Sequence, residues 1–142
     1  MSGFLLDTNI PSEMLRPRPD ANVAAWVKRQ SNETLFVSVV TMGELRRGAT
    51  LLGERSPRRL ELERMIHEKV PSWFQNRILP VTQTIAERWG TLDGERQLAG
   101  RPLNMADGMI AATALEHNLT VVTRNVKDFE QLGVALLNPW DA

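Results

Sequence analysis

Residues 4–13 read FLLDTNIPSE, in which three apolar side chains are followed at once by Asp7. The apolar run has the composition of a buried strand, and no polar spacer separates it from the aspartate. A buried carboxylate costs free energy unless it is hydrogen-bonded, paired with a cation or bound to a metal. Asp7 is therefore either a cap of the following helix or a ligand for a cation at the end of the strand.

Further apolar runs along the chain predict more strands, and segments with helical periodicity separate them. Most of these runs show little polar alternation, which is typical of strands covered on both faces of a parallel sheet. The alternation predicts right-handed βαβ units, and so a single α/β domain over residues 1–142 with helices on both faces of the sheet. The predicted strands span residues 4–6, 35–40, 78–81, 119–123 and 134–137.

Residues that favour helix ends lie between these strands. Asp20, Asn104 and the Ser-Pro pair at 56–57 are predicted helix starts, and Asn118 is a predicted C-terminal stop. Pro71 is expected to break or bend the helix that begins near residue 57, because proline lacks the N–H that a helix needs.

Composition sets the outer limits on function. Of the 142 residues, 42% are apolar and 24% are charged, and 17 basic side chains balance 17 acidic ones. This neutral total does not indicate a nucleic-acid binder. The absence of cysteine excludes disulfides and thiolate metal sites, and it fits a reducing compartment. With no apolar stretch long enough to span a bilayer, we expect a cytoplasmic protein.

Four polar side chains are predicted at one edge of the sheet. Asp7 ends the first strand, Glu44 follows the second and Asn125 follows the fourth. Because ligands collect at the carboxyl ends of parallel strands, these residues are expected to lie near one another. Asp107 lies in the first turn of the helix that leads into the fourth strand, and that helix begins at the same edge.

Each acid also has a structural interpretation. Thr41-x-x-Glu44 fits a capping box, Asn104-x-x-Asp107 resembles one, and Asp7 could form a turn ahead of the next helix. Any one of these acids alone would more often cap a helix than catalyse a reaction. Three separate segments that deliver acids to one edge favour a functional site, but capping also remains an explanation.

The residue types limit the chemistry of such a site. Clustered carboxylates raise one another's pKa or require a cation. Without cysteine, and with His67 and His117 both in helices, an all-oxygen site favours Mg²⁺ or Mn²⁺ over zinc. Such a site can orient a metal-bound water for attack on a phosphodiester. The chain has no phosphate-binding glycine loop, dinucleotide fingerprint or nucleophile elbow.

Five segments resemble one known family, in matching order over nearly the whole chain. They are LLDTN, TMGELRRG, ADGMIAATALEHNLTVVTRN, the KDF that follows it, and the NPW near the end. Together they resemble the PIN-domain toxins, and most closely the VapC/FitB-type ribonucleases of bacterial type II toxin–antitoxin pairs. One such segment would be weak evidence, but five in register are specific.

The resemblance implies a three-layer α/β/α fold and Mg²⁺-dependent endonucleolytic cleavage of RNA, with Mn²⁺ as a substitute. It assigns catalysis to Asp7, Glu44 and Asp107, and the metal to Asp7 and Asp107, with Thr8 and Asn9 in support. It also implies a homodimer, and a heterotetramer or larger assembly with a VapB- or FitA-like antitoxin. The C-terminal segment of that antitoxin is expected to block the site, and operator DNA to be bound only through it.

One position departs from the family pattern. Asn125, in TRN, stands where many relatives carry a fourth aspartate, which removes one negative charge from the site. Asn125 still offers a neutral oxygen and is counted with the catalytic residues, and Asp128 could compensate as a supporting residue if the following turn points it inward. Arg46 and Arg47 are the arginines best placed to contact RNA or an antitoxin, because a guanidinium fork matches phosphate and carboxylate.

Two other functions stay open on the sequence. In the first, the protein is mainly a regulatory binding module for a DNA-binding antitoxin, and its acids bind an antitoxin arginine. In the second, it is a DNA-directed nuclease, which is disfavoured because the chain is short and has no strongly basic face.

Overall fold

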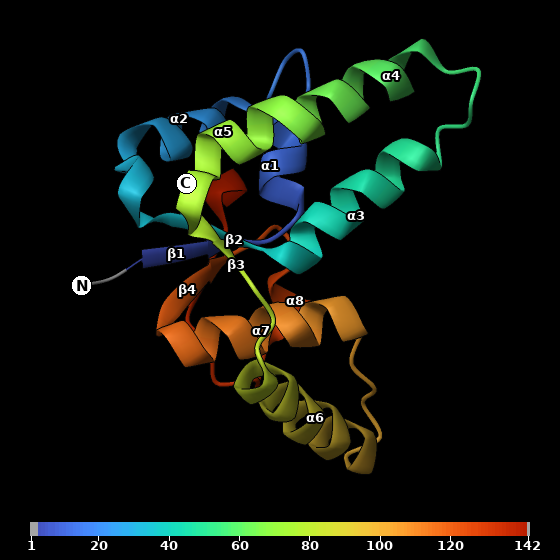
Figure 1. Ribbon diagram of the computed structural model, residues 1–142. Coiled ribbons are helices and arrows are strands. Elements are labelled where there is room, and N and C mark those ends of the chain that lie inside the picture. Colours follow the sequence, from blue (N-terminus) through green and yellow to red (C-terminus); the bar gives the residue numbers. More distant parts are fainter. Residues whose placement is uncertain (1–2, 142) are drawn as a thin grey trace.

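The computed structural model describes residues 3–141, and within them five short strands form one parallel sheet (Figure 1). The strand order is β3-β2-β1-β4-β5, so β1 is central and is hydrogen-bonded to both β2 and β4. The chain adds β2 and β3 on one side of β1 and then crosses to add β4 and β5 on the other. The strands are β1 (Gly3–Leu6), β2 (Leu35–Ser38), β3 (Ile78–Leu79), β4 (Leu119–Val122) and β5 (Leu136–Leu137).

All five predicted strands are present, and most are shorter than predicted. Residues 39–40 differ in kind, because they were predicted as strand but begin helix α3. Ser38 explains the difference, because its side chain accepts a hydrogen bond from the Val40 N–H at 3.0 Å and so caps the helix. A local cap outweighs the strand preference of β-branched residues here.

Helices cover both faces of the sheet, which gives the expected three-layer α/β/α arrangement (Figure 1). Helices α6 and α7 lie on one side of the sheet, and α1, α2, α4 and α5 lie on the other. The helices are α1 (Asn9–Met14), α2 (Ala21–Arg29), α3 (Val39–Thr50), α4 (Pro57–Arg64), α5 (Val70–Phe74), α6 (Gln83–Leu98), α7 (Met105–His117) and α8 (Val126–Phe129). Short 3₁₀ turns span Asn32–Thr34, Gln75–Arg77 and Pro139–Asp141.

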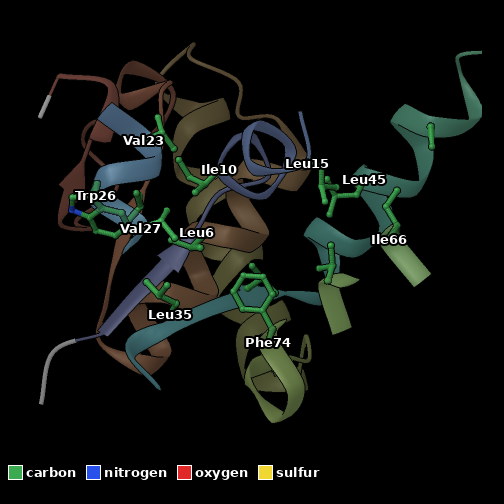
Figure 2. Close-up of a cluster of buried hydrophobic side chains, with 14 residues drawn as sticks. Leu6, Ile10, Leu15, Val23, Trp26, Val27, Leu35, Leu45, Ile66 and Phe74 are labelled. Atoms are coloured by element: carbon green, nitrogen blue, oxygen red, sulfur yellow. The ribbon is translucent and has the colours of Figure 1, made fainter. Parts of the chain in front are cut away.

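Successive side chains of the central strand point to opposite faces of the sheet. Leu6 belongs to the core cluster beneath α1, α2 and α5, which Figure 2 shows, while Leu5 packs into the second cluster under α7. Both leucines are fully buried, and burial of each side chain contributes about 1.5–3 kcal/mol. The same alternation places Val122 in the first cluster and Val121 in the second. These two cores hold rigid the strand ends that carry the site.

The predicted interruption at Pro71 takes the form of a π-helical turn at Met65–Lys69, between α4 and α5. Pro71 lies two residues after this turn in a helical path that is continuous over residues 57–74, and because it has no N–H to donate to the preceding turn, an interruption just before it is expected. The predicted caps are also present, although Ser56 makes no side-chain hydrogen bond. Asn118 ends α7 with a φ of 54°, a left-handed conformation that asparagine tolerates well.

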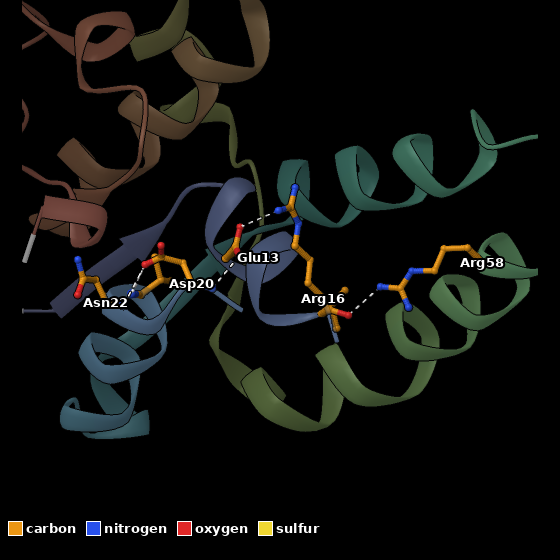
Figure 3. Close-up of polar contacts among 7 residues, drawn as sticks. Glu13, Arg16, Asp20, Asn22 and Arg58 are labelled. Carbon is orange, nitrogen blue, oxygen red and sulfur yellow. Dashed lines mark hydrogen bonds and ion pairs between the residues drawn. The ribbon is translucent and has the colours of Figure 1, made fainter. Parts of the chain in front are cut away.

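A cluster of polar side chains links α1, α2 and α4 by hydrogen bonds and an ion pair, away from the sheet edge (Figure 3). The buried Glu13 carboxylate accepts a hydrogen bond from the Asp20 N–H at 2.9 Å and pairs with Arg16 at 3.6 Å. Asp20 caps α2 through the Asn22 N–H, and Arg58 Nη2 donates to the Leu15 carbonyl at 2.8 Å. Each polar group in this cluster has a structural partner, so the cluster serves packing.

Within residues 3–141, no helix has both the length and the apolar composition needed to cross a membrane.

Candidate active site

The carboxyl ends of β1 and β4 meet at the point where the chain changes direction across the sheet, and a pocket of about 310 Å³ opens there. Open α/β sheets bind ligands at such a switch point. The three acids predicted from sequence all line this pocket, although they come from β1, α3 and α7. The lining residues are Asp7, Thr8, Asn9, Ser12, Glu44, Asp107 and Asn125.

Asp7 is the buried anchor of the pocket, with 5% of its surface exposed. Its Oδ1 accepts a hydrogen bond from the Thr8 N–H at 2.8 Å, and its Oδ2 accepts one from Thr123 Oγ1 at 2.8 Å. Burial raises the pKa of Asp7, and Glu44 and Asp128 add to the rise, while the two hydrogen bonds oppose it. The carboxylate is thus fixed in direction but poorly solvated, which favours a bound cation.

Glu44 reaches the same pocket from α3, and Thr8 links it to the first strand. Thr8 Oγ1 donates to Glu44 Oε1 at 2.5 Å and lies 3.1 Å from the buried Thr41 hydroxyl. The capping-box interpretation of Thr41 and Glu44 is wrong, because Ser38 caps α3 and Thr41 lies inside the helix. Glu44 is therefore in the body of α3, with its carboxylate directed to the pocket.

Asp107 enters from the first turn of α7, and Asn104 fixes that turn. The Asn104 side chain accepts hydrogen bonds from the N–H groups of Ala106 at 2.9 Å and Asp107 at 3.3 Å, so it is the helix cap. Partial burial raises the pKa of Asp107 to about 7, and the negative charges of Asp7, Asp128 and Glu44 add to the rise. The charged form of Asp107 is therefore destabilised, first by burial and then by the neighbouring negative charges.

Thr123 is a site residue that the sequence analysis missed. It is fully buried at the end of β4, where its hydroxyl donates to Asp7 and accepts from the Asn125 N–H at 3.0 Å. The Asn9 amide lies 3.4 Å from both the Asp7 Oδ2 and the Thr123 Oγ1. The sequence signal that could have identified Thr123 was its position, because a polar side chain directly after a buried apolar run does not add to the apolar core.

Asn125 and Asp128 differ in their relation to the pocket. Asn125 lines it, whereas Asp128 is exposed in α8 and acts there through its charge, which raises the pKa values of Asp7 and Asp107. Arg46 Nη1 forms an ion pair with Glu63 of α4 at 3.3 Å. Arg47 instead lines a groove of about 780 Å³ that shares Glu44 with the pocket. Of the two arginines, Arg47 has the better access to a ligand in the site.

The donor set tests whether a metal ion fits. Among residues 3–141, no three carboxylate, imidazole or thiolate side chains lie close enough together to hold one ion. This excludes a closed site of three or more such ligands in the described arrangement. Asp7 and Asp107 line one pocket and both have raised pKa values. A pair of carboxylates that leaves positions to water and phosphate is the arrangement that Mg²⁺ commonly uses, so the residues fit it.

Comparison with known proteins identifies the family. The family model described as "PIN domain" matches residues 4–134. The chain belongs to the PIN-domain family. Toxin FitB of Neisseria gonorrhoeae is 39% identical over 137 residues, covering 96% of this chain and 98% of FitB. The VapC ribonuclease Y4jK of Sinorhizobium fredii is 35% identical over 138 residues, and the match covers 97% of this PIN-domain chain and 98% of Y4jK.

A solved structure agrees with this assignment. The structure described as "Structure of FitAB bound to IR36 DNA fragment" has a chain that is 35% identical to this PIN domain. The two superpose with a TM-score of 0.86, covering 96% of this chain and 95% of the other. The PIN-domain resemblance found in the sequence is thereby confirmed, and so is the three-layer fold that it implied.

The hydrogen bond between Thr8 and Glu44 leads to a first prediction. Thr8→Val keeps the shape of the side chain but removes its hydroxyl, so Glu44 loses the donor at 2.5 Å. A hydrogen bond to a charged group contributes about 1.5–3 kcal/mol. We expect phosphodiester cleavage, the activity in the name of the ribonuclease relative, to fall about tenfold to hundredfold in a single-turnover assay. Thr8→Ser, which retains the hydroxyl, is the matched control, and equal activity of the two variants would contradict the prediction.

Proposed function

We propose that this PIN-domain protein is the toxin of a type II toxin–antitoxin pair and acts as a Mg²⁺-dependent endoribonuclease. The observation that carries the proposal is the convergence of Asp7, Glu44 and Asp107 on one pocket at the switch point of the sheet. The relatives named as a toxin and as a ribonuclease match along almost their full lengths, which supports the same assignment.

The chain's own residues divide the work in this proposal. Asp7 and Asp107 would hold the ion, and Thr123 and Thr8 orient Asp7 by their hydrogen bonds. When bound, Mg²⁺ supplies positive charge for the RNA phosphate and lowers the pKa of the attacking water. Glu44, held by Thr8, is placed to accept a proton at Oε2, because its Oε1 accepts from the Thr8 hydroxyl. The Asn125 amide donates to a phosphate oxygen without adding negative charge.

The neutral side chain at position 125 predicts the number of bound ions. Because Asn125 brings no charge to the pocket, we expect one firmly bound ion without RNA and a second only when RNA phosphate supplies the missing charge. Anomalous scattering from crystals grown with Mn²⁺ but no RNA measures this. We expect one fully occupied site in the wild type and an added site in Asn125→Asp. Two full sites in the wild type would exclude the hypothesis.

The partner in this proposal is an antitoxin of the FitA or VapB type. Its C-terminal segment is proposed to place an arginine among the pocket carboxylates, because a guanidinium pairs strongly with carboxylate. The solved structure described as FitAB bound to a DNA fragment contains a chain similar to this one in a complex with DNA, which supports an antitoxin partner and an association with DNA. The regulatory alternative uses the same surface without catalysis, so binding of the antitoxin alone does not separate the two functions.

Cleavage assays on the purified protein, freed of its partner, test the proposed function. We expect Mg²⁺-dependent cuts in RNA that EDTA abolishes, in a parallel digest of tRNA, ribosomal RNA, single-stranded DNA and duplex DNA. Cleavage of DNA in preference to RNA would support the DNA-directed alternative. Over-expression should arrest growth, and Asp7→Ala should relieve the arrest. No cleavage of any substrate, with growth unaffected, would leave the regulatory binding module as the function.

A further inference from the structure

Trp89 of α6 packs against Gly108 of α7, the residue that follows Asp107. A Cβ placed on Gly108 would lie 2.6 Å from Trp89 Cδ1 and 2.9 Å from Trp89 Nε1, and 3.0 Å from Leu103 Cδ2. Non-bonded carbon atoms pack at about 3.5–4.0 Å. The indole can therefore occupy this position only because residue 108 has no side chain.

The indole is held there at a cost. Within residues 3–141, Trp89 Nε1 is the one fully buried side-chain nitrogen or oxygen that has no hydrogen-bond partner. A buried donor without an acceptor destabilises the folded state. The contact thus depends on the shape of the indole ring and not on a hydrogen bond from its N–H. We call it a steric stop, because the ring limits how closely α7 can approach α6.

The steric stop acts on the first turns of α7. Helices α6 and α7 lie side by side on one face of the sheet (Figure 1). The later residues of α7, including Ile110 and Ala111, are fixed by the core beneath β1 and β4. The first turn has its cap from Asn104, which is itself exposed and belongs to the same helix. The Trp89 contact is therefore a lateral constraint on the end of α7 that carries Asp107, beside the contact from Leu103.

We propose that Trp89 and Gly108 are a positioning pair, in which the indole seated on the glycine backbone fixes where Asp107 enters the pocket. Neither residue lines the pocket, so neither touches the ligand. The inference rests on the proposed function for its catalytic consequence. Its structural consequence, the geometry of a cation site shared by Asp7 and Asp107, is measured separately.

The test is a double-mutant cycle with Gly108→Ala, Trp89→Leu and the combination of both. Gly108→Ala should push α7 away from α6, lower kcat at least about tenfold with little change in KM, and shrink the Mg²⁺-induced rise in Tm. Trp89→Leu makes room for the new methyl group, so the double variant should recover most of both readouts. Steric coupling between neighbouring residues predicts this non-additive result.

Gly94→Ala is the matched control, because Gly94 lies in α6 and a Cβ there would meet nothing within 4 Å. It should keep kcat and the Mg²⁺-induced shift unchanged. If Gly108→Ala behaves like Gly94→Ala in both readouts, or if the double variant is no better than Gly108→Ala, the positioning role is excluded.

If Gly108→Ala does not fold, Trp89→Leu alone decides, and an unchanged Mg²⁺-induced shift there excludes the role. If the wild type cuts no RNA, the proposed function fails while the Tm readout still tests the pair.

Discussion

Replacement of Asp7 by alanine should reduce the rate of RNA cleavage by about 10³-fold, which corresponds to roughly 4 kcal/mol of activation free energy. Asp7 is the pocket acid with the least solvent, and hydrogen bonds from Thr8 and Thr123 fix both of its oxygens. Its loss removes one of the two carboxylates proposed to hold the ion. It also leaves the buried Thr123 hydroxyl without its acceptor. Single-turnover cleavage at saturating Mg²⁺ measures the effect.

Asp7→Asn separates the charge of this side chain from its structural role. The amide keeps an acceptor oxygen and nearly the same volume, so the local packing should survive. Because burial raises the pKa of Asp7, the charged form destabilises the metal-free protein. We therefore expect Asp7→Asn to match or exceed the Tm of the wild type in EDTA while its cleavage falls as far as in Asp7→Ala. Cleavage near the wild-type rate in Asp7→Asn would contradict the assignment of Asp7 as a metal ligand.

The fold could be predicted because its signals are local and repeated. Continuous apolar runs, separated by helices with clear caps, allow few arrangements other than a parallel sheet covered on both faces. The strand ends were less predictable, since residues 39–40 favour a strand by composition and became helical through the Ser38 cap. A hydrogen bond of one side chain decided that boundary, and periodicity does not report such bonds.

The charged residues of the site could be predicted from pattern and topology, and Thr8 and Asn9 through the family resemblance, but the buried Thr41 and Thr123 were not predicted. Asp7, Glu44 and Asp107 were found because a charge next to an apolar run is unusual and the topology sends all three to one edge. Thr123 and Thr41 carry no charge, and threonine is common in strands. Their roles depend on contacts across 116 residues in the first case and 33 in the second. Sequence periodicity contains no information on such distant pairs.

The contact between Trp89 and Gly108 is another long-range contact that the sequence could not predict, in this case a packing contact. Glycine within the α7 sequence only weakens the helical pattern, and a tryptophan at helical spacing predicts a core residue. The sequence does not show that the two residues meet, nor that the glycine admits the indole. That information exists only once α6 and α7 are placed side by side on the sheet.

Cleavage at subsaturating Mg²⁺ should fall about tenfold for each pH unit below 7. Burial and the neighbouring acids raise the pKa of Asp107 to about 7, so below that pH a proton occupies the carboxylate. Metal ions bind the deprotonated carboxylate, and a proton therefore competes with the ion. The slope should flatten when Mg²⁺ is raised to saturation, because excess metal displaces the proton. A rate that is constant between pH 5.5 and 7.5 at subsaturating Mg²⁺ would contradict this prediction.

The stability of the metal-free protein should show the opposite dependence on pH. Between the ordinary pKa of 3.8 and the folded-state value of about 7, Asp107 binds a proton in the folded chain that the unfolded chain does not bind. The free energy of unfolding then decreases as pH rises through this window, since its slope follows the difference in bound protons. We expect Tm in EDTA to be lower at pH 7.5 than at pH 5.5, and added Mg²⁺ to raise Tm more at pH 7.5. Asp107→Asn should weaken both dependences, because the amide does not titrate, and the same pH dependence in that variant would place the proton on another group.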